Sequence, residues 1–154
     1  MDVKKYLISR LATTLEVELK ENPDLRDQGK NGWASRHVVE VADLNNMSTL
    51  AHEFTHVIQK LTGEYILSIP DFRKWMGDDP IDEDFVNWFL PIWKTWVEAG
   101  FYERRDLVWE FLPYYVTYAS NGWQVFQKVC RESGALNPPP GGYEQGVIYP
   151  PLNR

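Results

Sequence analysis

Apolar residues recur at helical spacing along most of the chain. Between positions 7 and 19 this spacing predicts a helix over residues 3–20, which Asn22-Pro23 would end. The same spacing predicts further helices over residues 49–61, 82–99, 102–119 and 123–132. Prolines fall inside two of these segments, at positions 91 and 113, and each is expected either to kink its helix or to lie in the first turn of a new one.

One segment has the pattern of a strand. Val38, Val39 and Val41 form a short β-branched run, and no hairpin partner for it stands out. A single strand among several helices predicts a mainly helical α+β fold with a small sheet edge. The length of 154 residues is that of one domain, which we place at residues 1–134. Residues 135–154 hold five of the ten prolines, and we expect them to form an extended tail.

Composition and charge exclude several classes of protein. The formal net charge is −6 and no cluster of Lys and Arg stands out, so we expect no nucleic-acid partner. Charges or prolines interrupt every apolar stretch well before the ~18 residues of a membrane span, so we expect no membrane partner. No signal-peptide pattern is present, which predicts a cytoplasmic protein or one delivered within a particle. Cys130 is the only cysteine, so an intramolecular disulfide is excluded.

The chemically informative stretch is a His-Glu-x-x-His sequence at positions 52–56. Two histidines four residues apart lie one above the other on a helix, so both imidazoles can bind one metal ion. At 100° per residue, His56 and Gln59 fall within about 40° of His52, whereas the apolar residues of the segment lie on the opposite face. Glu53 lies beside the histidine face and can reach a water held by the metal without being a ligand. The spacing therefore predicts a metal site with an adjacent general base.

The segment AHEFTHVIQ resembles the zinc-binding helix of the zincin metallopeptidases, including small bacterial and phage-encoded members. The strand before it, from His37 to Val41, resembles the zincin edge strand, which lines the cleft and pairs with extended substrate. The metzincin pattern would place Gly and His where this chain has Gln59 and Thr62, so the resemblance is to the gluzincins, in which a later helix supplies a carboxylate ligand. It implies Zn²⁺ as the cofactor, held by the two motif histidines and an acidic side chain.

Three downstream glutamates are candidates for that third ligand. Glu110 precedes an aromatic-rich helical stretch, as the ligand does in small gluzincin-like proteins, and it is our first choice. Glu98 and Glu103 stay open as alternatives, although two arginines follow Glu103 and could neutralise it by pairing.

Two residues are candidates for contacts to substrate or to a developing oxyanion. Tyr114 follows Glu110 on the same helix, as do Tyr115 and Tyr118, and one of these hydroxyls could donate to the oxyanion while the others pack in the core. His37 could contact the substrate or the oxyanion from the strand, although a strand-end histidine with no such role fits the sequence equally well.

These features predict a zinc-dependent hydrolase that acts on peptide or protein substrates, with Glu53 activating the water. The alternative is a structural or interaction protein that keeps the fold without catalysis, for example a component of a phage particle or secretion assembly. The aromatic content of 14% and the proline-rich tail, which could dock on a partner protein, favour this alternative. An open coordination position would favour catalysis, and a fourth protein ligand would favour the alternative.

Overall fold

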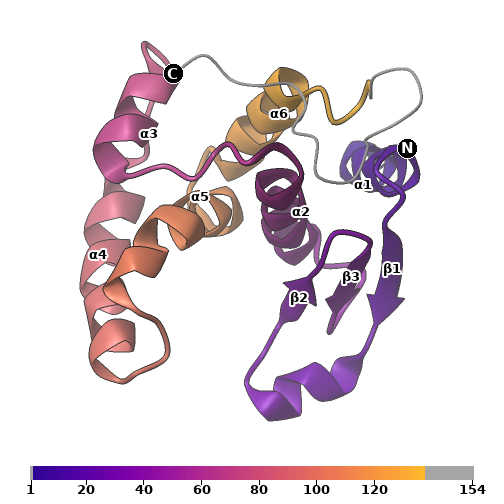
Figure 1. Cartoon of the computed structure of the whole chain (residues 1–154), viewed down its shortest axis with the longest axis horizontal. Helices are drawn as coiled ribbons and strands as arrows, with labels where there is room; N and C mark the ends of the chain where they lie inside the picture. Colours follow the sequence, from indigo (N-terminus) through magenta and orange to yellow (C-terminus); the bar gives the residue numbers. More distant parts are fainter. Residues whose placement is uncertain (1, 138–154) are drawn as a thin grey trace.

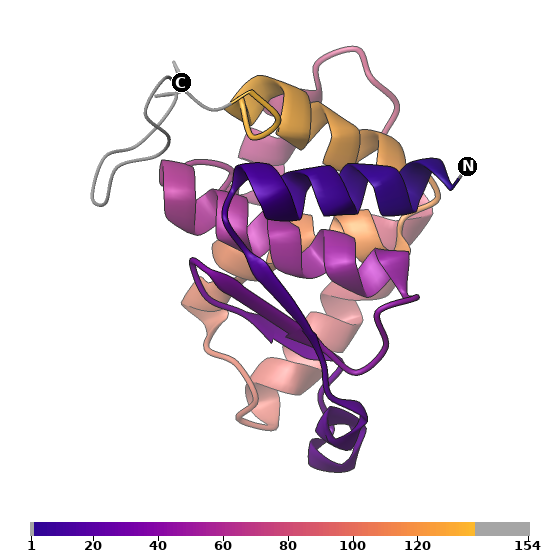
Figure 2. The ribbon, with the colours of Figure 1, turned by 90° about the vertical axis from the view of Figure 1, so that its right-hand side faces the viewer.

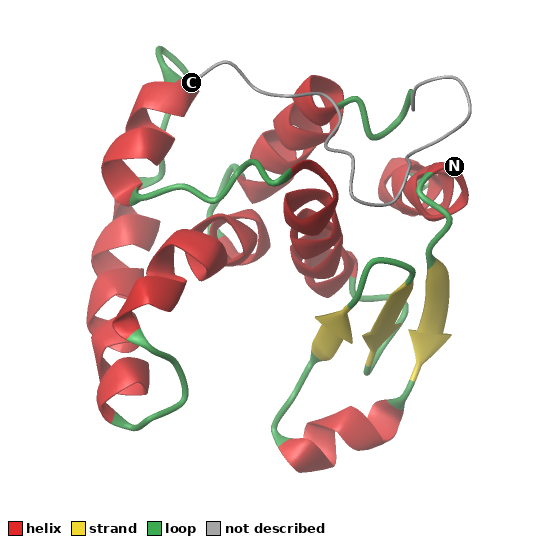
Figure 3. Cartoon of the chain, viewed as in Figure 1, coloured by secondary structure: helices red, strands yellow, loops and turns green. Residues whose placement is uncertain are grey.

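The structure of the chain is a computed structural model, and it describes residues 2–137. The chain is mainly helical and carries one small sheet, as the sequence predicts (Figure 3). The α-helices are α1 (Val3–Thr14), α2 (Met47–Thr62), α3 (Ile69–Met76), α4 (Glu83–Glu98), α5 (Leu107–Tyr118) and α6 (Gly122–Ser133). The strands are β1 (Glu18–Glu21), β2 (Gly32–Ala34) and β3 (Val38–Val41), and two 3₁₀ helices are η1 (Pro23–Gln28) and η2 (Arg104–Asp106). Within residues 2–137, no helix has the length and apolar character needed to cross a membrane.

The first helix is shorter than its apolar pattern predicts. It ends at Thr14, and the chain then turns through Glu16, whose φ is 56°. Residues 18–20, which we expected to be helical, instead lie in β1 and pair with β3. This segment is short, and its residues are all polar except Leu19, so it has little apolar surface to bury as a helix. Pairing with β3 therefore decides its structure.

The sheet has three strands in the order β1-β3-β2, with β1 parallel and β2 antiparallel to β3. The predicted strand at 38–41 is therefore the central strand and not the edge strand that we expected. The edge strand next to the helices is β2, a three-residue Gly-Trp-Ala segment that is too short to stand out in the sequence. The correction matters because the edge strand is the one with backbone groups free to meet another molecule.

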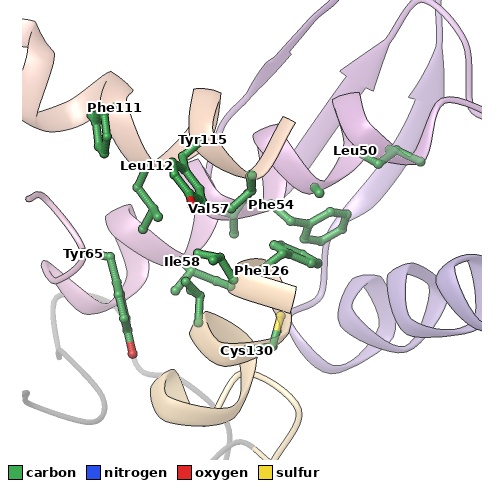
Figure 4. Packing of buried hydrophobic residues seen from close by; sticks show 14 of the residues in the cluster. Leu50, Phe54, Val57, Ile58, Tyr65, Phe111, Leu112, Tyr115, Phe126 and Cys130 are labelled. Carbon is green, nitrogen blue, oxygen red and sulfur yellow. The ribbon is translucent and has the colours of Figure 1, made fainter. Parts of the chain in front are cut away.

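Helix α2 lies at the centre of the molecule, between the sheet and α5, with α1 beside it (Figures 1 and 2). Asn46 caps its first turn, and Gly63 ends it in the left-handed conformation. Its apolar face is buried, as the wheel predicts: Leu50, Phe54, Val57 and Ile58 all belong to the hydrophobic core, and Phe54, Val57 and Ile58 lie in the cluster that contains Phe126 of α6 (Figure 4). The opposite face, which carries the two histidines, is thereby directed away from the core.

The packed domain extends slightly beyond the boundary that we placed at residue 134. Ala135 is buried, Leu136 packs against the core, and the Ala135 carbonyl accepts a hydrogen bond from Thr14 of α1. Of the tail that we placed at residues 135–154, residues 138–154 lie outside the part of the chain that the structure describes.

Candidate metal centre

The structure brings together the two motif histidines and the first-choice glutamate. The Nε2 atom of His56 lies 3.2 Å from Glu110 Oε2, and that of His52 lies 4.0 Å from the same oxygen. One ligand atom from each of the three residues falls within 4.8 Å of the others. Packing of α5 on α2 produces this arrangement, because Glu110 lies in the first turn of α5 and projects over the histidine face of α2. The three side chains are about as close as the ligands of a single metal ion.

The two alternative glutamates lie elsewhere. Glu98 is at the exposed C-terminal end of α4, and Glu103 pairs with Arg105 at 2.6 Å on the surface. Neither lines the cavity that contains the histidines. Among the acids we considered, only Glu110 is placed to share an ion with His52 and His56.

Hydrogen bonding fixes the tautomer of His52. Its Nδ1 lies 3.0 Å from Thr117 Oγ1, and that hydroxyl donates its proton to the Pro113 carbonyl at 2.8 Å. The hydroxyl oxygen must therefore accept from the imidazole, so Nδ1 carries the proton and Nε2 keeps its lone pair. Burial, followed by repulsion from His56, lowers the pKa of His52 to about 3. His52 is accordingly a neutral imidazole at pH 7, which is the form that binds metals.

His56 is fixed by a buried glutamine. The amide nitrogen of Gln59 donates to two backbone carbonyls, those of Tyr65 and Trp109, at 3.0 Å each. Its amide oxygen therefore faces His56 Nδ1, 2.9 Å away, and accepts the proton there. The Trp109 carbonyl is free for this contact because Pro113, four residues on within α5, has no N–H to donate to it. In the neutral form of His56 the lone pair is therefore on Nε2, the nitrogen that faces Glu110.

The donor set fits a cation. Two imidazole lone pairs and a carboxylate converge, and all three are hydrogen-bond acceptors with no proton to share in these tautomers. Their side chains are only 10–14% exposed, so water does little to separate them. Two neutral imidazole nitrogens and one carboxylate oxygen are a ligand set that Zn²⁺ takes in hydrolytic enzymes. The residues present therefore fit a bound zinc ion.

Glu53 is buried next to this group but is not part of it. Its side chain is directed at β2, because a Cβ placed on Gly32 would lie 3.0 Å from Glu53 Oε2. Glycine at this position therefore gives the carboxylate room against the edge strand. Burial is the main cause that raises the pKa of Glu53 to about 7, with the charge of Glu110 adding to it. A carboxyl with a pKa near neutrality suits a general base.

The histidines, Glu53 and Glu110 all line one cavity of about 370 Å³ between β2, α2 and α5. Tyr114 also lines it: its ring meets that of His52 edge-on at 4.7 Å, and its hydroxyl is 2.9 Å from that of Tyr102. One of the two hydroxyl protons forms this hydrogen bond, so the second proton can be donated to a group bound in the cavity. Burial raises the pKa of Tyr114, which keeps this hydroxyl protonated and able to donate.

The remaining predicted contacts lie in different surroundings. His37 is outside the cavity, and its Nδ1 lies 3.1 Å from the Glu16 carbonyl near the sheet. Tyr115 is a core residue whose hydroxyl donates to Asn121 and accepts from the backbone of Asp82. Tyr118 is 54% exposed at the cavity rim. Of these residues, Tyr114 is the one whose ring contacts a histidine of the motif.

Several residues of the site were missed from the sequence. Gln59 carried a usable signal, because the helical wheel places it on the histidine face. Thr117 carried a weaker one, since it lies seven residues after Glu110 and therefore on the same face of α5. Gly32 and Trp109 gave no signal, because their roles arise from contacts between segments far apart in the chain.

Replacing Gln59 by Ala is expected to lower the affinity of the site for a divalent metal ion by about 10- to 100-fold, the usual cost of losing a partner that orients a ligand. The change frees His56 to rotate and leaves the Tyr65 and Trp109 carbonyls without this donor. Competition against a chromophoric chelator measures the affinity, and Gln124→Ala, at an exposed position of α6, is the control. Unchanged affinity in the Gln59→Ala protein would show that the tautomer of His56 does not depend on the glutamine.

Comparison of the chain with protein-family models, with curated proteins and with solved structures gave no match.

Proposed function

We propose that the protein is a zinc-dependent hydrolase of the zincin type that cleaves peptide bonds. The observation that carries the proposal is the convergence of His52 Nε2, His56 Nε2 and the Glu110 carboxylate, with both Nδ1 protons engaged elsewhere. The resemblance of the α2 sequence to the gluzincin helix supports the choice of zinc and of this class of chemistry. Without this resemblance, the same three ligands would indicate a site for a divalent metal ion but would not indicate which reaction it catalyses.

The roles of the chain's own residues follow from their positions. Zinc bound by this group supplies Lewis acidity, which lowers the pKa of water and polarises a carbonyl. Glu53 lies in the same cavity with a pKa near 7, so it can take a proton from the attacking water and return it to the leaving amine. The Tyr102–Tyr114 hydroxyl pair can donate a proton to the oxyanion that develops on the substrate.

The edge strand supports a peptide substrate. Hydrogen bonds from Ser35 N to Val38 O and from Ala42 N to Asn31 O mark the residues of this hairpin whose backbone faces β3. Because such positions alternate in an antiparallel pair, the backbone groups of Gly32 and Ala34 face the free edge. Both residues line the cavity, so an extended peptide could add to β2 beside Glu53.

The number of protein ligands favours catalysis over the structural alternative. Among residues 2–137, the group that could hold an ion has three members, and the cavity lies beside them. Structural zinc sites use four protein ligands, whereas catalytic sites use three and keep one position for water or substrate.

Metal analysis and a peptide library test the proposal together. Purified wild-type protein is expected to bind about one zinc per chain, and His56→Ala to bind none. A degenerate peptide library should be cleaved by the wild type, with activity lost on chelation and restored by zinc, as followed by mass spectrometry. Failure to take up zinc would overturn the metal site, and zinc binding without any cleavage would overturn the hydrolase in favour of a structural role.

A further inference from the structure

The histidine face of α2 continues into a lysine. Lys60 follows His52 and His56 at the same four-residue spacing, so its side chain emerges one turn beyond His56 on the same side of the helix. It lines the same cavity, at an exposed position on its rim. Four residues correspond to about 6 Å along the helix axis, so the backbone of Lys60 lies about that far beyond the backbone of His56.

The ammonium group of Lys60 is held in place by the edge strand. Its Nζ donates to the Ala34 carbonyl at 2.7 Å, and this carbonyl faces the free edge of β2. A peptide that adds to the edge can therefore pair with Gly32 but finds the Ala34 carbonyl already occupied. Lys60 marks the end of the accessible edge, and the position of its charge is fixed there.

Among residues 2–137, the Lys60 ammonium group forms no ion pair with an acid at 4.0 Å or less, and its charge acts at longer range on Glu53, whose pKa it lowers. The ion pairs found there join other residues, and only one of the three ammonium donors of Lys60 is used. The acids in the cavity are Glu53, which is buried against β2, and Glu110, which faces the histidines. An incoming group therefore meets a positioned cation with two donors to spare.

We propose that Lys60 binds a carboxylate of the substrate, so that the protein prefers peptides with an acidic side chain or a free C-terminus close to the scissile bond. This inference rests on the proposed function. An ammonium group is a point charge that pairs with a carboxylate without demanding bidentate geometry, so both sources of carboxylate suit it. Because each residue of an extended peptide advances about 3.3 Å, the carboxylate lies one or two residues from the bond that is cleaved.

A binding experiment tests the inference without relying on turnover. Alanine-based peptides that carry one Glu or one Gln, with amidated C-termini, are titrated into metal-free full-length protein, and a free-C-terminus series distinguishes the second source. One carboxylate is expected to raise affinity about fivefold, the upper range for an exposed ion pair, and the gain should vanish near 1 M salt. Equal affinities of the Glu, Gln and free-acid peptides would overturn the inference.

Variants separate recognition from a structural role of Lys60. Lys60→Gln is expected to remove the preference for carboxylate, and Lys60→Glu to reverse it in favour of peptides with Lys. Lys94→Glu, on the exposed side of α4, changes the net charge equally and should keep the preference. A Lys60→Glu protein that still prefers Glu peptides would overturn the inference. A lysine that only supports β2 would not produce the reversal.

Turnover distinguishes this inference from the proposed function. Zinc-loaded protein should cleave the matched peptides with kcat/KM about fivefold higher for Glu than for Gln at one position. Cleavage with no such difference at any position would overturn the role of Lys60 and leave the hydrolase standing. Selective binding of carboxylate peptides without cleavage would overturn the hydrolase and leave the role of Lys60 in binding standing.

Discussion

Replacing Glu53 by Gln is expected to lower peptide turnover by at least about 10²-fold while the protein keeps its zinc. General-base catalysis contributes at least this factor, and Gln has the shape of Glu but cannot accept the proton. Zinc should stay because Glu53 is not in the ligand group and points toward Gly32. The fold should persist because burial raises the pKa of Glu53, which means that an ionised carboxylate is unfavourable here and a neutral amide is not.

The measurement pairs zinc content with initial rates on the same sample. Glu98→Gln, an identical change at an exposed position, serves as the control and should match the wild type in both. If Glu53→Gln retains zinc and full turnover, another group takes the proton and the role assigned to Glu53 is wrong. If it loses zinc, the carboxylate takes part in metal binding instead.

Removing Glu110 is expected to weaken zinc binding by more than about 100-fold, because a change to a residue that merely orients a ligand already costs 10- to 100-fold. Glu110→Ala leaves the two imidazoles in place but takes away the acid that, among residues 2–137, completes the ligand group with them. The loss should be visible by chelator competition and by metal analysis after dialysis. Melting temperatures recorded without metal would show whether the variant still folds.

The other two sequence candidates provide matched controls. Glu103→Ala breaks an exposed pair with Arg105, and Glu98→Ala removes an exposed carboxylate, so neither should alter zinc affinity. Loss of zinc in either variant, with Glu110→Ala still loaded, would mean that the third ligand is not on α5.

The sequence predicted those parts of the site that lie on single helices. The spacing of His52 and His56, and the apolar stripe opposite them, follow from the helical period alone. Glu110 was selected through a family resemblance and not from the residues themselves. The structure adds the contact between α5 and α2 that brings it to the histidines.

The parts of the fold and of the site that the sequence did not predict arise from contacts between segments far apart in the chain. Strand β2 has three residues, and only its pairing with β3 makes it a strand. Residues 18–20 have helical spacing, yet they lie in β1 because β3 offers them a partner. The hydrogen bonds of Gln59 to Trp109 and of His52 to Thr117 span 50 and 65 residues, and no local pattern encodes them.

Pro113 gives the protein a trade-off between helix strength and metal geometry. Its missing N–H leaves the Trp109 carbonyl to Gln59 and so to His56, and its own carbonyl holds Thr117 and so His52. A routine effort to make the protein more heat-stable would replace a proline inside a helix, because such a residue costs about 3 kcal/mol. Here the new N–H would compete with Gln59 for Trp109. Thermostabilised versions of this chain are therefore better designed from its surface than from α5.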